Sequence, residues 1–455
     1  MPIPEQTQPR VIDALYLELL DRGITYFLPD VRVIGSESAD AVGSPAPRGS
    51  RDDDGSLALA WLGSAYALTR ERGRGFSAGE AKLIKSISKV LWARYQVLFD
   101  SALMARSFDA FRGQPEDRYV SAFLDPSLYA SAENLARSHD RVADAIEVLR
   151  VTSSSTYENR RIATGVLLFG SLPDPCHPLP PLPAGALRYS NSLTSSRSFH
   201  RLCDGLQTVA LVDRAGLMVE LVDVHEWTVP FGDVPLPVPT AARYQAHSQA
   251  TVCGGHVCLV LTPNGEIKIF ADGVQVFNFL DGRWRLTDAA EKYAVWEQAV
   301  GDPKLAERLF TAALNLAEHR RGGLFVILDD REAISRIVAP RDLLASEGRT
   351  REDTTTASKE HFHYLLRDTR VTELAQTVLE SVARIDGGIV LDRGSHLLAF
   401  GAILRQHAEP GVDLQPSEGG RTTAAIHASR VGNVLKVSED GLISFFQSGQ
   451  CVWEI

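Results

Sequence analysis

The chain has 455 residues, of which 44% are hydrophobic and 23% are charged, and its formal net charge is −10 at pH 7. This length predicts more than one domain, and the composition is that of an ordinary globular protein. The negative charge disfavours nucleic acid as a partner, because binding along a phosphate backbone requires a positively charged surface.

No segment has the pattern of a signal peptide or of a membrane-spanning helix. The longest apolar run, at residues 57–68, is too short and too polar to cross a bilayer. The five cysteines are scattered and form neither a disulfide framework nor a zinc-ligand pattern. We therefore expect a cytoplasmic protein without a membrane partner.

The first part of the chain, residues 1–125, is predicted to be an α+β region. Apolar residues recur at helical spacing over residues 9–22, and residues 57–69 have the pattern of a buried strand. A long amphipathic helix is predicted over residues 77–99. The strand, the charged loop after it and this helix weakly resemble the end of a GAF-type sensor domain, which favours a sensory role for the region.

Residues 75–79 fit the G-x-S-x-G pattern of a hydrolase nucleophile elbow. Such an elbow needs a buried strand directly before it, whereas a run of arginines and one glutamate precedes this segment. Ser77 is followed at the right spacing by Glu80, and the two residues form a capping box. Ser77 is therefore predicted to begin the helix and not to act as a nucleophile.

Residues 126–235 form a second predicted α+β region. An amphipathic helix is expected over residues 130–151, and strands are expected over residues 164–170 and 208–224. A cluster of prolines at residues 230–239 then marks the main predicted domain boundary.

Residues 236–302 carry the pattern of a β-meander that leads into the last domain. Strand-like runs between residues 256 and 286 are separated by the turn dipeptides Asn264-Gly265, Asp272-Gly273 and Asp281-Gly282. Because Asn-Gly and Asp-Gly favour the tight turns of hairpins, we expect successive antiparallel strands here.

The last region, residues 303–455, alternates helices with strands. Helices are predicted over residues 304–320, over residues 371–385 and from residue 423, and strands over residues 323–328, 388–391, 397–404, 434–437 and 442–446. This alternation predicts an α/β fold, in which a mixed, twisted sheet is flanked by helices.

Three short motifs in this region have the chemistry of a triphosphate site. An acidic group precedes a strand in Asp386-Gly387-Gly388, and a glycine-flanked arginine-threonine loop opens a helix in Gly419-Gly420-Arg421-Thr422-Thr423. A second acidic group follows a later strand in Ser438-Glu439-Asp440-Gly441. Each motif alone is typical of an ordinary turn or helix start. Their occurrence together, in this order, favours a shared site.

The whole segment 303–455 resembles the diadenylate cyclase (DAC) domain of the DNA-integrity scanning protein and its relatives. Residues 322–328 resemble the first strand of that family, and residues 386–388 stand where the family has Asp-Gly-Ala. Residues 419–425 stand where it has Gly-Thr-Arg-His-Arg-Ala-Ala, and residues 438–444 where it has Ser-Glu-Glu-Thr-Gly-x-Ile-Ser.

The resemblance implies condensation of two ATP molecules into cyclic di-AMP, or a related cyclic dinucleotide, with release of pyrophosphate. It implies that Asp386 and Glu439 hold Mg²⁺ or Mn²⁺, and that Asp386 also meets the attacking hydroxyl. Since each domain of the family holds one ATP, it further implies a face-to-face homodimer or a larger homo-oligomer. The other implied residues contact phosphate or nucleotide: Arg421, Thr422, Thr423, Gly419, Gly420, Gly387, Gly388 and Ser438.

The chain departs from the family at the phosphate motif, where Arg-His-Arg is replaced by Arg421-Thr422-Thr423. Loss of positive charge beside a triphosphate can lower the rate by roughly 10²-fold or more. An alternative function is therefore a catalytically weak or inactive nucleotide-binding sensor with the same fold. A third is a scaffold in which the pocket is vestigial.

Overall fold

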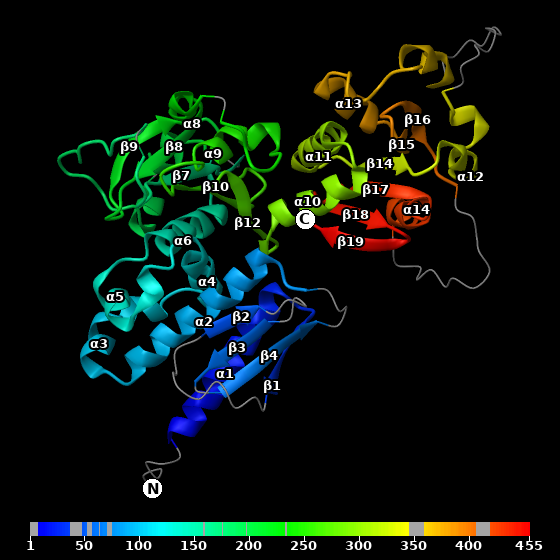
Figure 1. Cartoon of the computed structure of the whole chain (residues 1–455). Helices are drawn as coiled ribbons and strands as arrows, with labels where there is room; N and C mark the ends of the chain where they lie inside the picture. The colour runs from blue at the N-terminus through cyan, green and yellow to red at the C-terminus, as the bar shows by residue number, and fades with distance from the viewer. Residues whose placement is uncertain are drawn as a thin grey trace. The chain divides into compact units, whose positions relative to one another are not determined.

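The chain is a mixed α/β protein, as predicted, and Figure 1 shows its computed structural model. The structure describes residues 8–36, 48–51, 57–62, 64–70, 75–157, 160–174, 176–196, 198–232, 234–344, 359–405 and 419–455. Contacts between Cα atoms group the chain into two units. The first consists of Met1–Leu236 and Ala246–Asp288, and the second of Pro237–Gln245 and Ala289–Ile455.

In the first unit, two helices accompany a small antiparallel sheet. Helix α1 (Gln8–Phe27) packs against α2 (Ala78–Leu98), and the strands follow the order β1-β4-β3-β2. The strand expected over residues 57–69 is in fact a hairpin, because Leu62 adopts a positive φ of 48° and reverses the chain. The strands are β1 (Val31–Ser36), β2 (Arg48–Arg51), β3 (Leu57–Trp61) and β4 (Ser64–Arg70).

The capping box at the start of α2 is confirmed. The Ser77 hydroxyl accepts a hydrogen bond from the Glu80 N–H at 2.9 Å, and the Glu80 carboxylate accepts one from the Ser77 N–H at 2.8 Å. Both bonds satisfy N–H groups that a helix leaves free at its beginning. The serine of the G-x-S-x-G pattern is therefore a helix cap, as predicted.

The helix expected over residues 130–151 is divided into two helices. Helix α5 (Ala132–Arg137) ends before Asp140, whose carboxylate accepts a hydrogen bond from the Ala143 N–H at 3.0 Å and caps α6 (Arg141–Ser153). The apolar spacing continues across the break, so the spacing alone could not reveal it. Helices α3 (Ser101–Arg106) and α4 (Pro115–Leu124) precede this pair.

A larger sheet completes the first unit, with the strand order β13-β12-β11-β10-β7-β8-β9. Neighbouring strands are antiparallel except for the parallel pair of β7 and β8. The strand expected over residues 208–224 is a hairpin that turns at Gly216, where φ is +79°. The strands are β7 (Thr164–Leu168), β8 (Thr208–Val212), β9 (Met218–Asp223), β10 (Val257–Leu261), β11 (Ile267–Ala271), β12 (Val274–Leu280) and β13 (Arg283–Leu286).

The predicted meander is present as strands β10 to β13, and its Asp-Gly turns take the expected form. Asp272 and Gly273, and likewise Asp281 and Gly282, all have positive φ, as the tight turns of antiparallel hairpins require. The sequence pattern predicts the meander as a region of its own, at residues 236–302. In the structure its first strand pairs with β7, so the meander extends the sheet of the first unit.

The second unit is built on a mixed sheet with the strand order β16-β15-β14-β17-β18-β19. Every residue of β14 (Gly323–Leu328) and β17 (Gly432–Val437) is buried, because helices cover both faces of the sheet. Helix α11 (Pro303–Glu318) packs on one face, and α14 (Gly420–Ala428) contributes Ala425 and Ala428 to the core on the other. The remaining strands are β15 (Gly388–Asp392), β16 (Leu397–Ala402), β18 (Ile443–Gln447) and β19 (Gln450–Glu454).

The helix expected over residues 371–385 begins later, as α13 (Gln376–Ala383), and α10 (Ala289–Val300) precedes α11. Shorter elements are α7 (Phe199–Leu202), α8 (Val224–Thr228), α9 (Gln245–Gln249), α12 (Ile334–Ile337), β5 (Thr156–Tyr157) and β6 (Arg160–Arg161). Within the part of the chain that the structure describes, none of the helices combines the length and the apolar character needed to cross a membrane.

Candidate functional site

The strand directions of the second unit bring the three sequence motifs to one edge of its sheet. Strands β14 and β15 are parallel and in register, with Phe325 opposite Ile389, so both begin at the same edge. Strand β17 is antiparallel to β14, with Val437 opposite Gly323, so it ends there. The residues just before β15 and just after β17 therefore flank the residue that precedes β14.

Asp386, Arg421 and Glu439 meet at this edge, as the shared site requires. Arg421 Nη1 donates a hydrogen bond to Glu439 Oε1 at 2.9 Å, and Arg421 Nη2 lies 3.8 Å from Asp386 Oδ1. The guanidinium group thus joins two carboxylates that stand on opposite sides of β14. Here Arg421 contacts carboxylates, while the role implied by the resemblance is contact with phosphate.

The position of Arg421 depends on Gly322, the residue before β14. A Cβ atom on Gly322 would lie 2.1 Å from Arg421 Nη1, so any side chain there would displace the guanidinium group. In the sequence, Gly322 stands out only as part of a strand motif. Its role becomes visible only when α14 is placed over the edge of the sheet.

The cluster is open to solvent. The side chains of Asp386 and Glu439 are 90% and 71% exposed, and that of Arg421 is 40% exposed. Ion pairs this exposed contribute little to stability, so stabilisation of the fold does not account for the arrangement. An accessible pair of carboxylates beside a fixed guanidinium is instead suited to a ligand that carries both a cation and phosphate groups.

The two carboxylates fit a hard divalent cation that keeps several other ligands. Mg²⁺ is typically held by one or two protein carboxylates, with water and substrate phosphates completing the shell. Among the described residues, no group of three or more His, Cys, Asp or Glu side chains could hold a metal ion by itself. Asp386 and Glu439 would therefore need further ligands, such as water or phosphate, to hold a cation.

The beginning of α14 offers backbone N–H groups to an anion. Its first residue follows Gly419, which has no side chain to cap the helix, and the N–H groups of Thr422 and Thr423 bond to the Gly419 carbonyl at 2.9 and 3.2 Å. A Cβ atom on Gly419 or Gly420 would meet no described atom within 4 Å. The helix start is therefore accessible, and exposed N–H groups at a helix start attract phosphate.

A lysine that belongs to none of the three sequence motifs lies directly beside this helix start. Lys436 on β17 is only 6% exposed, and its Nζ donates a hydrogen bond to Thr422 Oγ1 at 3.0 Å. The available signal is a lysine within the apolar strand Gly432–Val437, because lysine is rarely buried without a specific reason. A positive charge thus remains next to Thr422, where the resembling family has a basic motif.

The other predicted residues have roles within the fold. Gly387 has a φ of +113°, and a Cβ atom on it would lie 2.4 Å from the carbonyl carbon of Gly401, so glycine is required by the approach of β16. Gly388 pairs with Ala402 in the sheet. Ser438 closes the turn after β17, its N–H donating to the Leu442 carbonyl at 2.8 Å. Contact of these residues with a nucleotide stays a prediction.

No protein-family model matches the sequence, and no curated protein matches it. Among solved structures, the chain is similar to one described as a hypothetical membrane-spanning protein from Bacillus cereus, with 22% identity, coverage of 36% of this chain and 70% of that one, and a TM-score of 0.26. It is also similar to a double cysteine mutant of DacA from Staphylococcus aureus, with 20% identity, coverage of 34% and 85%, and a TM-score of 0.22. Sequence identities and TM-scores this low support no conclusion about activity.

Proposed function

We propose that the second unit binds ATP together with Mg²⁺ or Mn²⁺, and that the protein is a divergent diadenylate cyclase of the cytoplasm. The observation that carries the proposal is the bridge formed by Arg421 between Asp386 and Glu439 at the open start of α14. Carboxylates for a cation, a guanidinium for phosphate and free helix N–H groups are together what a metal-bound triphosphate requires.

On binding, the contacts of the cluster are exchanged. Asp386 and Glu439 would hold the cation, which would supply positive charge to neutralise the phosphate groups. Arg421, released from the two carboxylates, donates to phosphate oxygens, and the N–H groups of Gly420 and Arg421 face the same anion. Lys436 and the Thr422 hydroxyl, which lie beside the same helix start, add a buried positive charge and a hydrogen-bond donor.

The proposed reaction is a double nucleotidyl transfer. The 3′-hydroxyl oxygen of one ATP forms a bond to the α-phosphorus of the other, the bond between the α-phosphorus and the bridging oxygen breaks, and pyrophosphate leaves. In this proposal, Asp386 accepts the proton of the attacking hydroxyl. In the second step, the 3′-hydroxyl of the other nucleotide attacks the α-phosphorus of the first, and loss of the second pyrophosphate closes the ring. Two sites must therefore face each other, and a cluster as exposed as this one is open to a second copy.

The second candidate function is nucleotide binding without turnover. It is favoured by the neutral side chains of Thr422 and Thr423, which offer hydrogen bonds but cannot stabilise developing charge as strongly as basic residues do. In that case the first unit and the nucleotide site would together form a sensor. In the cyclase reading, the first unit would regulate the cyclase.

The two functions are separated by incubating the full chain with labelled ATP and Mn²⁺ and analysing the products by chromatography. A cyclic dinucleotide and pyrophosphate that are lost in Asp386→Asn support the cyclase. ATP binding without product supports the sensor. Absence of both product and binding contradicts both functions and leaves a scaffold with a vestigial pocket.

A further inference from the structure

A proline-rich segment of the first unit lies between strands β7 and β8 and takes part in no helix, strand or turn. It consists of residues 178–183, with the sequence Pro-Leu-Pro-Pro-Leu-Pro, and is called the proline segment below. Five of its six residues are exposed, and Pro180 is half-buried. Leu179 and Leu182 are 44% and 50% exposed, so the segment presents apolar side chains to solvent.

The covalent structure of the proline segment determines its backbone conformation. Every one of its residues is a proline or stands directly before one. Proline holds φ at about −65°, and the residue before a proline is restricted to extended conformations. A chain under these constraints adopts the polyproline II helix, which has three residues per turn. Leu179 and Leu182 are three residues apart, so they lie on one edge of that helix.

The main chain of the proline segment is free for a partner. Within the described part of the chain, residues 178–182 make no hydrogen bond, and the Pro183 carbonyl accepts one from the Ala186 N–H at 3.1 Å. The prolines have no N–H group, so the segment carries mostly acceptors. Because polyproline II has no internal hydrogen bonds, these carbonyl groups are available to donors on another molecule.

His177 holds the start of the proline segment in place. Its side chain is only 9% exposed, and its ring stacks on that of Trp227 in α8 with the centroids 4.0 Å apart. His177 Nδ1 lies 3.0 Å from Asp174 Oδ2, and Nε2 lies 2.8 Å from the carbonyl oxygen of Trp227. The residue directly before the segment is therefore fixed by contacts with two parts of the unit.

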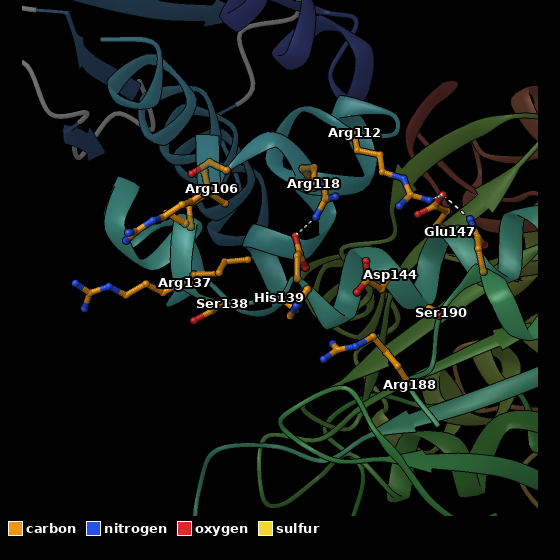
Figure 2. Close-up of a pocket in the computed structure, with 16 residues that line it drawn as sticks. Arg106, Arg112, Arg118, Arg137, Ser138, His139, Asp144, Glu147, Arg188 and Ser190 are labelled. Carbon is orange, nitrogen blue, oxygen red and sulfur yellow. Dashed lines mark hydrogen bonds and ion pairs between the residues drawn. The ribbon is translucent and has the colours of Figure 1, made fainter. Parts of the chain in front are cut away.

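The chain is fixed again soon after the proline segment. The Tyr189 N–H donates to the Gly216 carbonyl at 2.9 Å, and the Tyr189 side chain is buried. Asn191 Nδ2 donates to Glu147 Oε1 on α6 at 2.5 Å, which is one of the hydrogen bonds drawn at Glu147 in Figure 2. The proline segment is thus an exposed bridge between two anchored points. Binding such a preset segment costs little ordering entropy.

The composition of the proline segment excludes several kinds of partner. A strand added to the edge of a sheet needs N–H groups along its length, and four of the six residues lack one. An amphipathic helix bound in a groove is excluded because proline breaks helices. The segment has no charged side chain, so it offers nothing to a phosphate group or to a charged surface. Recognition by aromatic rings is the mode that its chemistry fits.

We propose that the proline segment is the docking site for a separate protein domain whose groove is lined by aromatic side chains. Such grooves bind polyproline II chains, because prolines and apolar side chains pack between the rings while groups such as the indole N–H donate to carbonyls. Leu179 and Leu182 enter the groove from one edge of the helix. The proposal does not depend on the activity of the second unit.

Titration of the full chain into purified, isotope-labelled SH3, WW and EVH1 domains tests the proposal, because all three classes have aromatic-lined grooves. We expect saturable shifts of the groove resonances in at least one class. The double variant Leu179→Ser/Leu182→Ser should bind at least about tenfold more weakly, because two apolar side chains are no longer removed from water. Leu187→Ser, at a 62% exposed position outside the segment, is the matched control and should bind like the wild type.

A further variant separates the backbone from the side chains. Pro181→Gly keeps both leucines but releases the backbone, so it should also weaken binding. Circular dichroism checks that each variant is folded. The proposal is overturned if none of the three domain classes binds the wild type, or if the shifts lie outside the aromatic groove. It is equally overturned if the folded double variant or Pro181→Gly binds as tightly as Leu187→Ser.

Discussion

Lys436 Nζ donates a hydrogen bond to Thr422 Oγ1 at 3.0 Å, and this bond ties the buried face of β17 to the first turn of α14. The ammonium group therefore lies beside the loop whose sequence has lost two basic residues relative to the family it resembles. Because charge close to a triphosphate acts strongly in a partly buried site, the proposed function assigns to this lysine part of the positive charge that the loop lacks.

We therefore expect Lys436→Met to lower ATP affinity and any turnover by about tenfold. Methionine keeps most of the volume of the side chain but carries no charge, so the fold should persist. Titration with ATP and Mn²⁺ measures the effect. Lys304→Met, at an exposed position of α11, is the matched control and should bind like the wild type. Equal ATP affinities of the two variants would show that Lys436 does not contribute to the site.

Gly322→Ala should displace the Arg421 guanidinium, because the added Cβ would lie 2.1 Å from Nη1. We expect a loss of ATP affinity similar to that of Arg421→Gln. If Gly322 acts through Arg421, the two losses are not additive, and the double variant binds no more weakly than Arg421→Gln alone. A fully additive double variant would show that Gly322 acts in another way.

Asp386→Asn should abolish cyclisation without affecting stability. The side chain is 90% exposed, so the change in the free energy of unfolding should stay within about 0.5 kcal/mol. Asp440→Asn changes a neighbouring exposed carboxylate, which accepts a hydrogen bond from the Leu442 N–H at 3.3 Å, and it should retain activity. Normal turnover by Asp386→Asn would refute its assignment to the cation and the attacking hydroxyl.

A buried group in the first unit predicts how stability depends on pH. His256 Nε2 lies 2.9 Å from Asp174 Oδ2, while His256 Nδ1 accepts a hydrogen bond from the Gly170 N–H at 2.8 Å. An imidazole that accepts at Nδ1 must be neutral. Burial lowers the pKa of His256 below 6.5, although Asp174 partly opposes the shift. For Asp174, burial alone would raise the pKa, but hydrogen bonds from His256, Cys176 and His177 bring it below 3.8.

Both shifts make the first unit sensitive to acid. Because the folded pKa of His256 is depressed, its contribution is present above about pH 6.5 and is lost as the pH falls. The contribution of Asp174 is present above pH 3.8 and is lost at lower pH still. Urea unfolding between pH 7.5 and 5 should show the loss of stability caused by His256. The free energy of unfolding should fall by at most about 1.4 kcal/mol per pH unit. His256→Gln should abolish it, whereas His225→Gln, at an exposed position, should not.

The sequence predicts those parts of the structure that local rules determine. The Asp-Gly turns, the capping box at Ser77 and the strand that follows Asp386 all result from short patterns. The meeting of Asp386 and Glu439 is implied by an ordered set of motifs, since strand direction then fixes the shared edge.

Other features depend on contacts that no short pattern encodes. The break at Asp140 lies within continuous helical spacing. It is fixed by three hydrogen-bond donors from elsewhere in the unit, Arg118, Ser121 and Tyr129, together with the Ala143 N–H of α6. The hydrogen bond of Lys436 to Thr422 requires α14 to lie over β17. In the first unit, one cavity is lined by residues as far apart in the sequence as Arg106 and Arg188. Such sites become visible only when the tertiary structure is known.

Titration of the wild-type chain and of Arg421→Gln with ATP in the presence of Mn²⁺ decides whether the Asp386, Arg421 and Glu439 cluster is a nucleotide site. We predict saturable binding to the wild type and an affinity at least about tenfold lower for Arg421→Gln. A wild type that does not bind ATP, or a folded Arg421→Gln variant with unchanged affinity, would contradict the proposed function.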